Sequence, residues 1–232
     1  MMSTNLIPTS NSSDDVYFQS LRNQMVEEQI RKRGIHDARV LEAMSAVPRE
    51  EFVPIGSREQ AYCDWALQIG WEQTISQPYT VAFMVEALGL RGDEKVLEIG
   101  TGSGYGAAVL SRLAAHVHTV ERIRELADMA RERLQRLHYG NVTVHFADGS
   151  RGLPEFAPYD AMISTAAASS LPPPLVAQLA PGGRIVIPIG GFTGQTMSRF
   201  TKTGGDLVQE NLGLFAFVPL IGEYGQRPAS FP

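Results

Sequence analysis

A glycine-rich turn lies near the middle of this 232-residue chain. Glycines alternate at Gly100, Gly102 and Gly104, directly after the largely apolar segment 96–99. Because glycine has no Cβ, the backbone of such a turn can approach a ligand closely and adopt conformations that other residues avoid. A helix that follows the turn would direct its free amide groups at the same ligand. We therefore predict a ligand-binding turn whose members are Gly100, Thr101, Gly102, Ser103 and Gly104.

Two acidic residues follow the next two segments that are predicted to be strands. Glu121 can accept hydrogen bonds from both hydroxyl groups of a ribose, and Arg122 beside it is assigned to the same site. Asp148 can accept a hydrogen bond from an adenine amino group, and Gly149 would leave room for the ring. Two structural alternatives stay open, since Glu121 could be a solvated carboxylate at a helix start and Asp148 could close an Asx turn.

The residue after the glycine turn separates two classes of adenosine ligand. Tyr105 stands where the dinucleotide motif GxGxxG has its third glycine. The GxGxG pattern suits a ligand without a pyrophosphate, so S-adenosylmethionine is favoured, and a nicotinamide dehydrogenase is the alternative. Glu98 lies within the strand, where a buried carboxylate is costly unless it is hydrogen-bonded. We expect Glu98 to organise the turn or to balance the positive methionine end of the cofactor; an internal hydrogen bond is the alternative.

The hydrophobic pattern places these motifs at the ends of strands. Strand-like and helical segments alternate through the middle of the chain, which is typical of a parallel sheet with helices on both faces. The predicted strands are 96–99, 117–120, 142–146, 159–164 and 184–189, and the predicted helices are 105–115, 122–137 and 175–179. Segments 197–201, 207–211 and 214–220 follow without helices between them. We expect these three to extend the sheet as antiparallel strands.

The part of the chain before the sheet is predicted to be mostly helical. Segments 16–33, 37–44 and 78–88 carry helical patterns, and Pro78 suits a helix start. Segment 60–73 has no clear period and is expected to form loops with a short strand. The predicted fold class is α/β: a Rossmann-like class I methyltransferase with a mostly parallel, doubly wound sheet, antiparallel C-terminal strands and an N-terminal helical cap.

The length fits one domain with additional elements. Residues 1–15 are rich in Ser, Thr and Asn and are predicted to form a flexible tail. Residues 16–232 are predicted to form a single methyltransferase domain. Its parts are a helical cap with the active-site segment (16–90), a cofactor-binding core (91–190) and the C-terminal antiparallel strands (191–232).

The composition argues against several functional classes. The net charge of −5 gives no basic footprint for nucleic acid or an anionic membrane. The longest apolar stretch, 212–222, contains Pro219 and is shorter than the roughly 20 residues of a membrane helix. The N-terminus does not resemble a secretory signal, so the cytoplasm is expected. Cys63 is the only cysteine and the five histidines lack metal-ligand spacing, so no metal is expected.

Several short motifs in a fixed order resemble those of a known family. Residues 72–78 read EQTISQP, residues 97–105 read LEIGTGSGY and residues 217–220 read FVPL. Together they resemble the protein-L-isoaspartate O-methyltransferases over residues 20 to 222. Many methyltransferases share the glycine turn, whereas TISQP and FVPL are more specific. Further matching pieces are 46–49, 52–53, 120–122, 148–149, 158–160, 178–179 and 182–183.

The resemblance implies methyl transfer from S-adenosylmethionine to the free α-carboxylate of L-isoaspartyl residues. Damaged proteins and peptides would be the partners, and a monomer is expected. The methyl ester would then collapse to a succinimide, whose hydrolysis returns some normal aspartate. An α-carboxyl group has a pKa of about 3.5, so only about one in three thousand is protonated at pH 7 and no general base is needed. The enzyme has to position the reactants and exclude water.

The same resemblance assigns roles to the EQTISQP segment. Ser76 corresponds to the family's active-site serine, and its hydroxyl can donate to one carboxylate oxygen and orient the other. A cap on the helix that starts near Pro78 is the structural alternative for Ser76. Thr74 and Ile75 are assigned to the cofactor.

Two further segments are expected at the acceptor side of the site. Thr165 and Ala166, after the fourth strand, should face the methyl end of the cofactor and contact the substrate. By resemblance, Val218 and Pro219 of the FVPL segment also bind the peptide. An ordinary core strand is the alternative interpretation of this apolar segment.

The chain departs from the family pattern at a few positions. Trp71 and Glu72 replace a small or polar pair that often ends in glycine, and Gly106 replaces a larger residue. The bulky ring and the added charge could narrow the pocket or weaken substrate binding. A methyltransferase that acts on another carboxylate or on a small molecule is therefore an alternative. A noncatalytic module that binds S-adenosylmethionine is another, although Ser76 and Glu121 argue against it.

Overall fold

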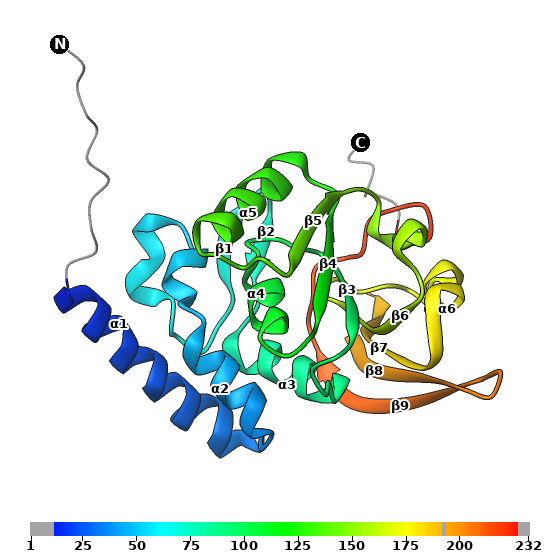
Figure 1. The fold of residues 1–232 in the computed structure, drawn as a ribbon, viewed down its shortest axis with the longest axis horizontal. Coiled ribbons are helices and arrows are strands. Elements are labelled where there is room, and N and C mark those ends of the chain that lie inside the picture. The colour runs from blue at the N-terminus through cyan, green and yellow to red at the C-terminus, as the bar shows by residue number, and fades with distance from the viewer. Residues whose placement is uncertain (1–11, 192–193, 227–232) are drawn as a thin grey trace, which may run out of the picture.

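A seven-stranded sheet runs through the molecule, with α3, α4 and α5 on one side and α6 on the other (Figure 1). The computed structural model describes residues 12–191 and 194–226. In sheet order the strands are β5 (Val142–Phe146), β4 (His116–Glu121), β3 (Lys95–Ile99), β6 (Tyr159–Ser164), β7 (Leu179–Gly191), β8 (Gly194–Thr203) and β9 (Asp206–Phe215). Neighbours from β5 to β7 are parallel, whereas β8 and β9 are antiparallel. The predicted fold class is confirmed.

The strand order reverses at β3. The chain passes from β3 to β4 and β5 on one side, and then crosses to β6 on the other side of β3. In open α/β sheets, ligands bind outside the carboxyl ends of the strands at such a reversal. The glycine turn after β3, Glu121 at the end of β4 and the loop after β6 all lie at this edge.

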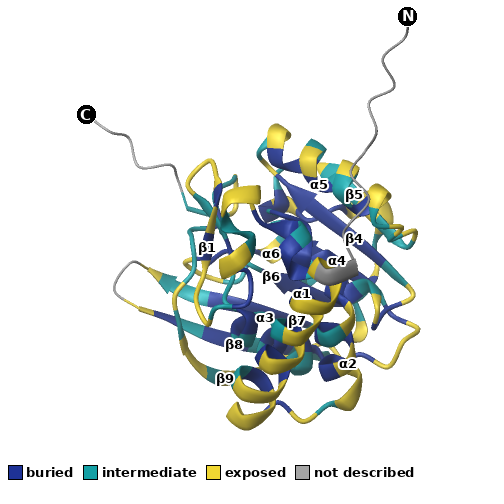
Figure 2. Ribbon diagram, turned by 90° about the vertical axis from the view of Figure 1, so that its left-hand side faces the viewer, coloured by how far each residue is buried: buried dark blue, intermediate teal, exposed yellow. Residues whose placement is uncertain are grey.

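Side chains of the central strands alternate between two cores, as the pleat requires. In β3, Val96 packs in the core that includes residues of α3 (Pro78–Leu88), α4 (Tyr105–Ser111) and α5 (Arg124–Arg136). Its neighbour Leu97 packs in the opposite core, which includes Leu175 of α6 (Pro173–Gln178). Figure 2 shows the buried strands between helices whose outer faces are exposed. Within the described ranges, no helix is long and apolar enough to cross a membrane.

The N-terminal cap begins earlier than the sequence indicates. Helix α1 (Ser12–Gln24) starts inside the predicted tail and continues through a π-helical segment (Met25–Ile30) and a 3₁₀ turn (Arg31–Arg33). Residues 12–15 are therefore helical, and residues 1–11 lie outside the described part of the chain. The helical path ends at Gly34, which has a φ of 100° that favours glycine. Helix α2 (Ala38–Ala46) follows.

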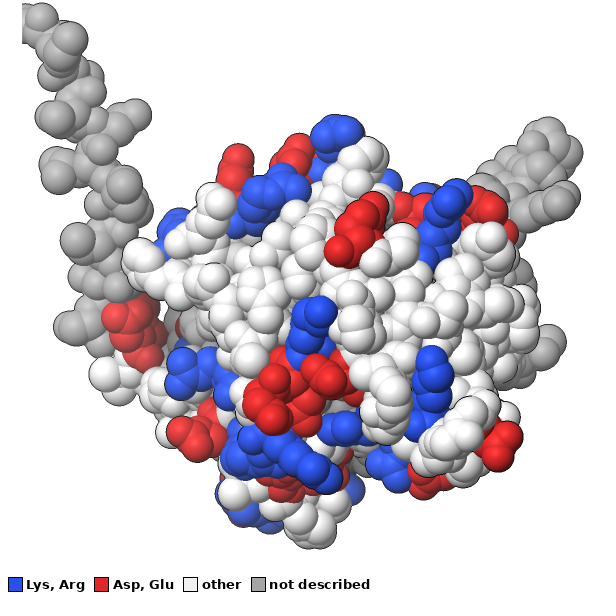
Figure 3. All heavy atoms as spheres, turned by 45° about the vertical axis from the view of Figure 1, so that its right-hand side comes forward, with Lys and Arg blue, Asp and Glu red and all other residues white. Residues whose placement is uncertain are grey.

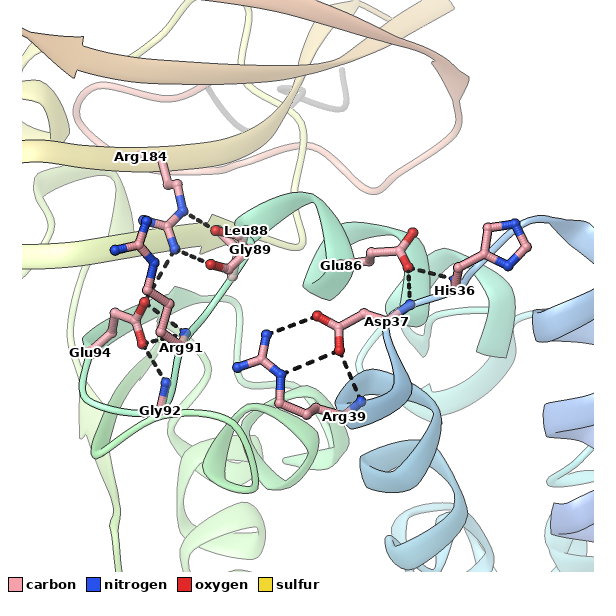
Figure 4. Close-up of polar contacts among 10 residues, drawn as sticks. All are labelled: His36, Asp37, Arg39, Glu86, Leu88, Gly89, Arg91, Gly92, Glu94 and Arg184. Carbon is pink, nitrogen blue, oxygen red and sulfur yellow. Dashed lines mark hydrogen bonds and ion pairs between the residues drawn. The ribbon is translucent and has the colours of Figure 1, made fainter.

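Polar contacts fix the connections around α3 (Figure 4). Glu86 accepts hydrogen bonds from the backbone amides of His36 and Asp37, both at 2.7 Å, and so ties α3 to the start of α2. At the same C-terminal end of α3, Arg184 of β7 donates to the carbonyl oxygens of Leu88 and Gly89. Glu94 accepts from the amides of residues 91 and 92. These bonds fix the path from α3 into β3.

A short hairpin, which the sequence shows only as a segment without a clear period, lies beside the glycine turn. Strands β1 (Leu67–Gly70) and β2 (Gln73–Ile75) pair antiparallel, and Trp71 and Glu72 form the tip. Both tip residues are left-handed, with φ of 50° and 56°. The expected short strand is confirmed and has a partner strand.

The predicted separate strand 214–220 is wrong. Strand β9 already includes residues 214 and 215, and the following residues leave the sheet. The amide of Ala167 donates to the carbonyl oxygen of Val218, and the amide of Leu220 donates to that of Ala167, both at 2.8 Å. The FVPL segment therefore pairs with the loop after β6, because that loop offers free backbone groups beside the site.

We expect Glu72→Gly to stabilise the protein. A left-handed backbone costs a non-glycine residue about 1–2 kcal/mol, which the glycine substitution removes. Glycine also raises the conformational entropy of the unfolded chain, and this offsets part of the stabilisation. The net gain in the free energy of unfolding should be about 0.5–1 kcal/mol, measured by urea unfolding. Glu42→Gly, at an exposed position within α2, is the matched control and should destabilise by about 1 kcal/mol. Destabilisation by Glu72→Gly would show that the tip conformation carries no strain.

Candidate active site

The glycine turn joins the carboxyl end of β3 to α4. Gly100, Gly102 and Gly104 have φ of 95°, 51° and 91°, a backbone region that favours glycine. A Cβ at Gly100 would overlap Oγ1 of Thr165, and one at Gly102 would lie 3.3 Å from Cδ1 of Ile69 in the hairpin. The turn therefore has to be made of glycine, because neighbours from two other elements approach it closely.

Glu121 holds the turn from the end of β4. Its Oε2 accepts a hydrogen bond from the amide of Gly102 at 2.9 Å, and its Oε1 accepts from the amides of Arg122 and Ile123. The side chain is buried, and it borders the cavity described below. A carboxylate oxygen can accept a further hydrogen bond, so Oε2 remains able to bind a hydroxyl group of a ligand. The alternative of a solvated carboxylate does not fit this burial.

Glu98 organises the turn through two hydroxyl groups. Thr119 donates to its Oε2 at 2.6 Å, and Oγ1 of Thr119 lies 2.7 Å from Oγ1 of Thr101. Because the one hydroxyl proton of Thr119 is given to Glu98, Thr101 must donate to Thr119. Burial, opposed by the Thr119 hydrogen bond and reinforced by the charge of Glu121, raises the pKa of Glu98 to about 8.

Gly106 makes room for Glu98. A Cβ at position 106 would overlap Oε1 of Glu98, so a larger residue could not occupy the first turn of α4 without displacing this carboxyl group. The departure from the family pattern at Gly106 thus has a packing reason.

The Asp148 segment closes its own turn. Oδ1 of Asp148 accepts from the amide and the hydroxyl of Ser150, and Oδ2 accepts from the amide of Glu223. The Asx-turn alternative is therefore confirmed, and the adenine contact stays a prediction. A Cβ at Gly149 would lie 2.7 Å from Cγ2 of Ile99, so packing against β3 already requires glycine there.

Ser76 lies between β2 and α3, and its hydroxyl does not cap the helix. The N-cap residue is Gln77, which makes no side-chain cap hydrogen bond. Instead, the side-chain amide of Gln77 donates to Oδ1 of Asp64 at 2.8 Å, and the carbonyl oxygen of Ser76 accepts from Arg49 at 2.8 Å. The carbonyl group of Ser76 and the side chain of the next residue are thus held in place.

Two adjoining cavities meet at Ser76. The first, the cofactor cavity, lies over the glycine turn, and the second, the acceptor groove, opens between the Ser76 segment and residues 214–218. Four residues border both cavities: Thr74, Ser76, Thr165 and Val218. Figure 3 shows one face of the molecule, on which acidic and basic side chains adjoin in a cluster at and below the centre, and a largely uncharged area lies above this cluster.

The cofactor cavity brings together most residues predicted for it. Of the residues predicted to bind the cofactor, it is lined by Thr74, Ile75, Glu98, Gly100, Thr101, Gly102, Ser103, Glu121, Arg122 and Gly149. The residues predicted for the acceptor side also border it: Ser76, Thr165, Ala166, Val218 and Pro219. Gly104 and Asp148 do not border it. The cavity also has residues that the sequence analysis missed: Gln73, Val81, Ile99, Tyr105, Gly106, Val120, Leu220 and Ile221. Most of these residues lie within or next to the EQTISQP, LEIGTGSGY and FVPL motifs, and Val120 precedes Glu121. Their place in the sequence was therefore the signal that could have identified them.

The composition of the cavity fits S-adenosylmethionine. Glu121 places a buried carboxylate with spare acceptor capacity at the cavity, and the glycine turn borders the cavity with backbone and without side chains at Gly100 and Gly102. Trp71 and Glu72 border neither cavity, so the family departure at the hairpin tip lies away from the reacting groups. Among the described residues, no group of three or more His, Cys, Asp or Glu side chains is placed to hold a metal ion.

The reversal at β3 and the GxGxG turn define a class I S-adenosylmethionine-dependent methyltransferase. The family model of the protein-L-isoaspartate(D-aspartate) O-methyltransferases (PCMT) matches residues 20–225. The chain belongs to this family, which confirms the predicted family, enzyme class and cofactor.

Individual relatives agree with the family model. The protein-L-isoaspartate O-methyltransferase of Rhodopseudomonas palustris is 54% identical over 207 residues, 88% of this chain and 95% of that protein. That of Dictyoglomus turgidum is 52% identical over 206 residues, 89% of this chain and 94% of the relative. A solved protein-L-isoaspartate O-methyltransferase is similar with a TM-score of 0.79 and 32% identity, over 88% of this chain and 67% of the other. A Plasmodium falciparum structure, described as a putative protein-L-isoaspartate O-methyltransferase in complex with S-adenosyl-L-homocysteine, is similar with a TM-score of 0.76 and 25% identity. The similarity covers 86% of this chain and 98% of the other.

Glu98→Gln should change how stability depends on pH. Because the pKa of Glu98 is raised to about 8, the folded protein keeps a proton that the unfolded chain releases near its ordinary pKa. The contribution of Glu98 to the free energy of unfolding is therefore present at low pH and is lost as the pH rises from about 4.5 to about 8.

Urea unfolding of the wild type and of Glu98→Gln across this range measures the effect. The wild type should lose stability relative to the variant as the pH rises. Glu132→Gln, on an exposed part of α5, is the control for removal of a carboxylate. Parallel pH profiles for the wild type and Glu98→Gln would contradict the raised pKa.

Proposed function

We propose that the chain methylates the free α-carboxylate of L-isoaspartyl residues in damaged proteins and peptides, with Ser76 as the residue that binds this carboxylate. The observation that carries the proposal is the place of Ser76 on the border of both cavities. A methyl group can pass from one bound molecule to another only where their sites meet. Thr165 and Val218 share this border and are proposed to contact the acceptor with Ala166 and Pro219, which border the cofactor cavity.

The chemistry asks little of the side chains. S-adenosylmethionine supplies an activated methyl group on a positively charged sulfur. The acceptor carboxylate is already ionised at pH 7, so the site needs no base to remove a proton. Ser76 donates its hydroxyl proton to one carboxylate oxygen, which leaves the other oxygen free to react. The remaining work is to hold the reactants in line and to exclude water.

The acceptor groove fits a peptide ligand. Trp65, Tyr79, Phe215 and Phe217 give it apolar surface, and Trp65 is 53% exposed. A chain segment on either side of an isoaspartyl residue could pack on such a surface while its carboxylate reaches Ser76. This supports damaged proteins and peptides over a small-molecule acceptor.

The setting of the enzyme is part of the same proposal. A monomer in the cytoplasm, without nucleic acid or membrane as partner, is compatible with the net charge of −5.

An activity assay tests the proposed reaction directly. The assay compares formation of S-adenosyl-L-homocysteine with an isoaspartyl peptide and with the same peptide carrying normal aspartate. Equal rates with both peptides would refute the proposed acceptor.

Ser76→Ala should lower kcat/KM for an isoaspartyl peptide roughly 10- to 100-fold, because a hydrogen bond to a charged group contributes about 1.5–3 kcal/mol. The affinity for S-adenosyl-L-homocysteine, measured by calorimetry, should change little. Ser111→Ala removes a hydroxyl that only bonds the carbonyl oxygen of Ala108 and serves as the matched control. Normal turnover in Ser76→Ala would remove the role proposed for this serine.

A further inference from the structure

Arg49 is a fully buried cation that the reaction described above does not use. Its exposed fraction is 0%, although arginine is almost never buried without a charged partner. The residue belongs to the 46–49 piece of the family resemblance, to which no role is assigned. Burial lowers the pKa of Arg49, but a guanidinium group keeps its charge in proteins. A buried charge is costly, so its contacts show what it stabilises.

The contacts of Arg49 lead to the active site. Its Nε donates to the carbonyl oxygen of Ala61 at 2.7 Å, and its Nη2 donates to the carbonyl oxygen of Ser76 at 2.8 Å. The guanidinium carbon lies 4.8 Å from the ring centre of Tyr105, the first residue of α4. One side chain therefore contacts the serine segment and the helix that follows the glycine turn.

A second buried arginine nearby makes a different set of contacts. Arg22 is 7% exposed and pairs with Glu50 at 3.0 Å. It also donates to the hydroxyl of Tyr62 at 2.7 Å, and Tyr62 in turn donates to Glu50. Arg22 thus has a carboxylate partner and makes no hydrogen bond to Ser76, whereas Arg49 donates its hydrogen bonds to the backbone carbonyl groups of Ala61 and Ser76.

We propose that Arg49 is a positioning residue for the reaction, which holds the backbone of Ser76 so that the serine hydroxyl meets the acceptor carboxylate. The inference rests on the role proposed for Ser76. Arg49 borders neither cavity and cannot touch the reactants, so it acts through the serine. Small displacements of a group that aligns reactants lower the rate strongly. A planar guanidinium reaches two carbonyl groups at once, which the single ammonium of lysine does not reproduce.

The test replaces Arg49 by Lys and by Gln, with Arg22→Lys and Arg22→Gln as matched controls from the same buried region. Kinetics with an isoaspartyl peptide, calorimetry with S-adenosyl-L-homocysteine and thermal unfolding are measured for each variant. We expect the Arg49 variants to lose at least tenfold in kcat while the dissociation constant of S-adenosyl-L-homocysteine stays within about threefold. The Arg22 variants should lose stability with kcat within about threefold of the wild type. If kcat falls in proportion to Tm in the Arg49 variants and in the Arg22 variants alike, the proposal is overturned.

A double-mutant cycle separates positioning from general support of the fold. If Arg49 acts through Ser76, adding Arg49→Lys or Arg49→Gln to Ser76→Ala should lower kcat less than threefold further, whereas independent effects would multiply. Multiplication of the two effects overturns the inference. It is overturned as well if both Arg49 variants fail to fold while the Arg22 variants fold.

The outcomes also distinguish the two proposals. Normal kcat in Ser76→Ala alone removes the role of the serine, and the role of Arg49 with it. Loss of kcat in Ser76→Ala, combined with wild-type kcat in both Arg49 variants, removes only the role of Arg49.

Discussion

The close approach of the loop after β6 to the glycine turn after β3 holds the site together. Oγ1 of Thr165 donates to the carbonyl oxygen of Gly100 at 2.8 Å, and the amide of Thr165 donates to that of Ile99 at 2.9 Å. These bonds join the two strand ends on either side of the reversal in strand order. They leave no space for a Cβ at position 100. Thr165, which makes this contact, also borders both cavities.

Buried polar groups fix the rest of the site around this contact. Glu98 reaches the turn through Thr119 and Thr101, and Glu121 holds the amide of Gly102. Each group is satisfied by hydrogen bonds at the carboxyl ends of neighbouring strands, where an unpaired charge would be costly. Fully hydrogen-bonded buried networks rigidify the residues that form them, which suits a reaction that depends on alignment.

The sequence predicted the parts of the fold that repeat a local pattern. Strands β3 to β6 and helices α3 and α5 lie close to their predicted positions, because apolar spacing and a first-turn proline mark them. The helical start at residue 12 and the course of segment 217–220 were predicted wrongly. Polar residues at a helix start resemble a tail, and the apolar FVPL segment resembles a strand until its pairing with Ala167 is known.

The sequence by itself determined the class of ligand and the family, because the glycine turn, Glu121 and the EQTISQP and FVPL motifs are local features of the chain. Only the tertiary structure decided what these motifs touch. It showed that Asp148 accepts hydrogen bonds within its own turn and that Gly106 leaves room for Glu98. It also showed that Arg49 donates a hydrogen bond to the backbone carbonyl of Ser76. The reason is physical: a motif records which residue types the chain carries, whereas hydrogen bonds and steric contacts between distant segments exist only after the strands have paired and the helices have packed.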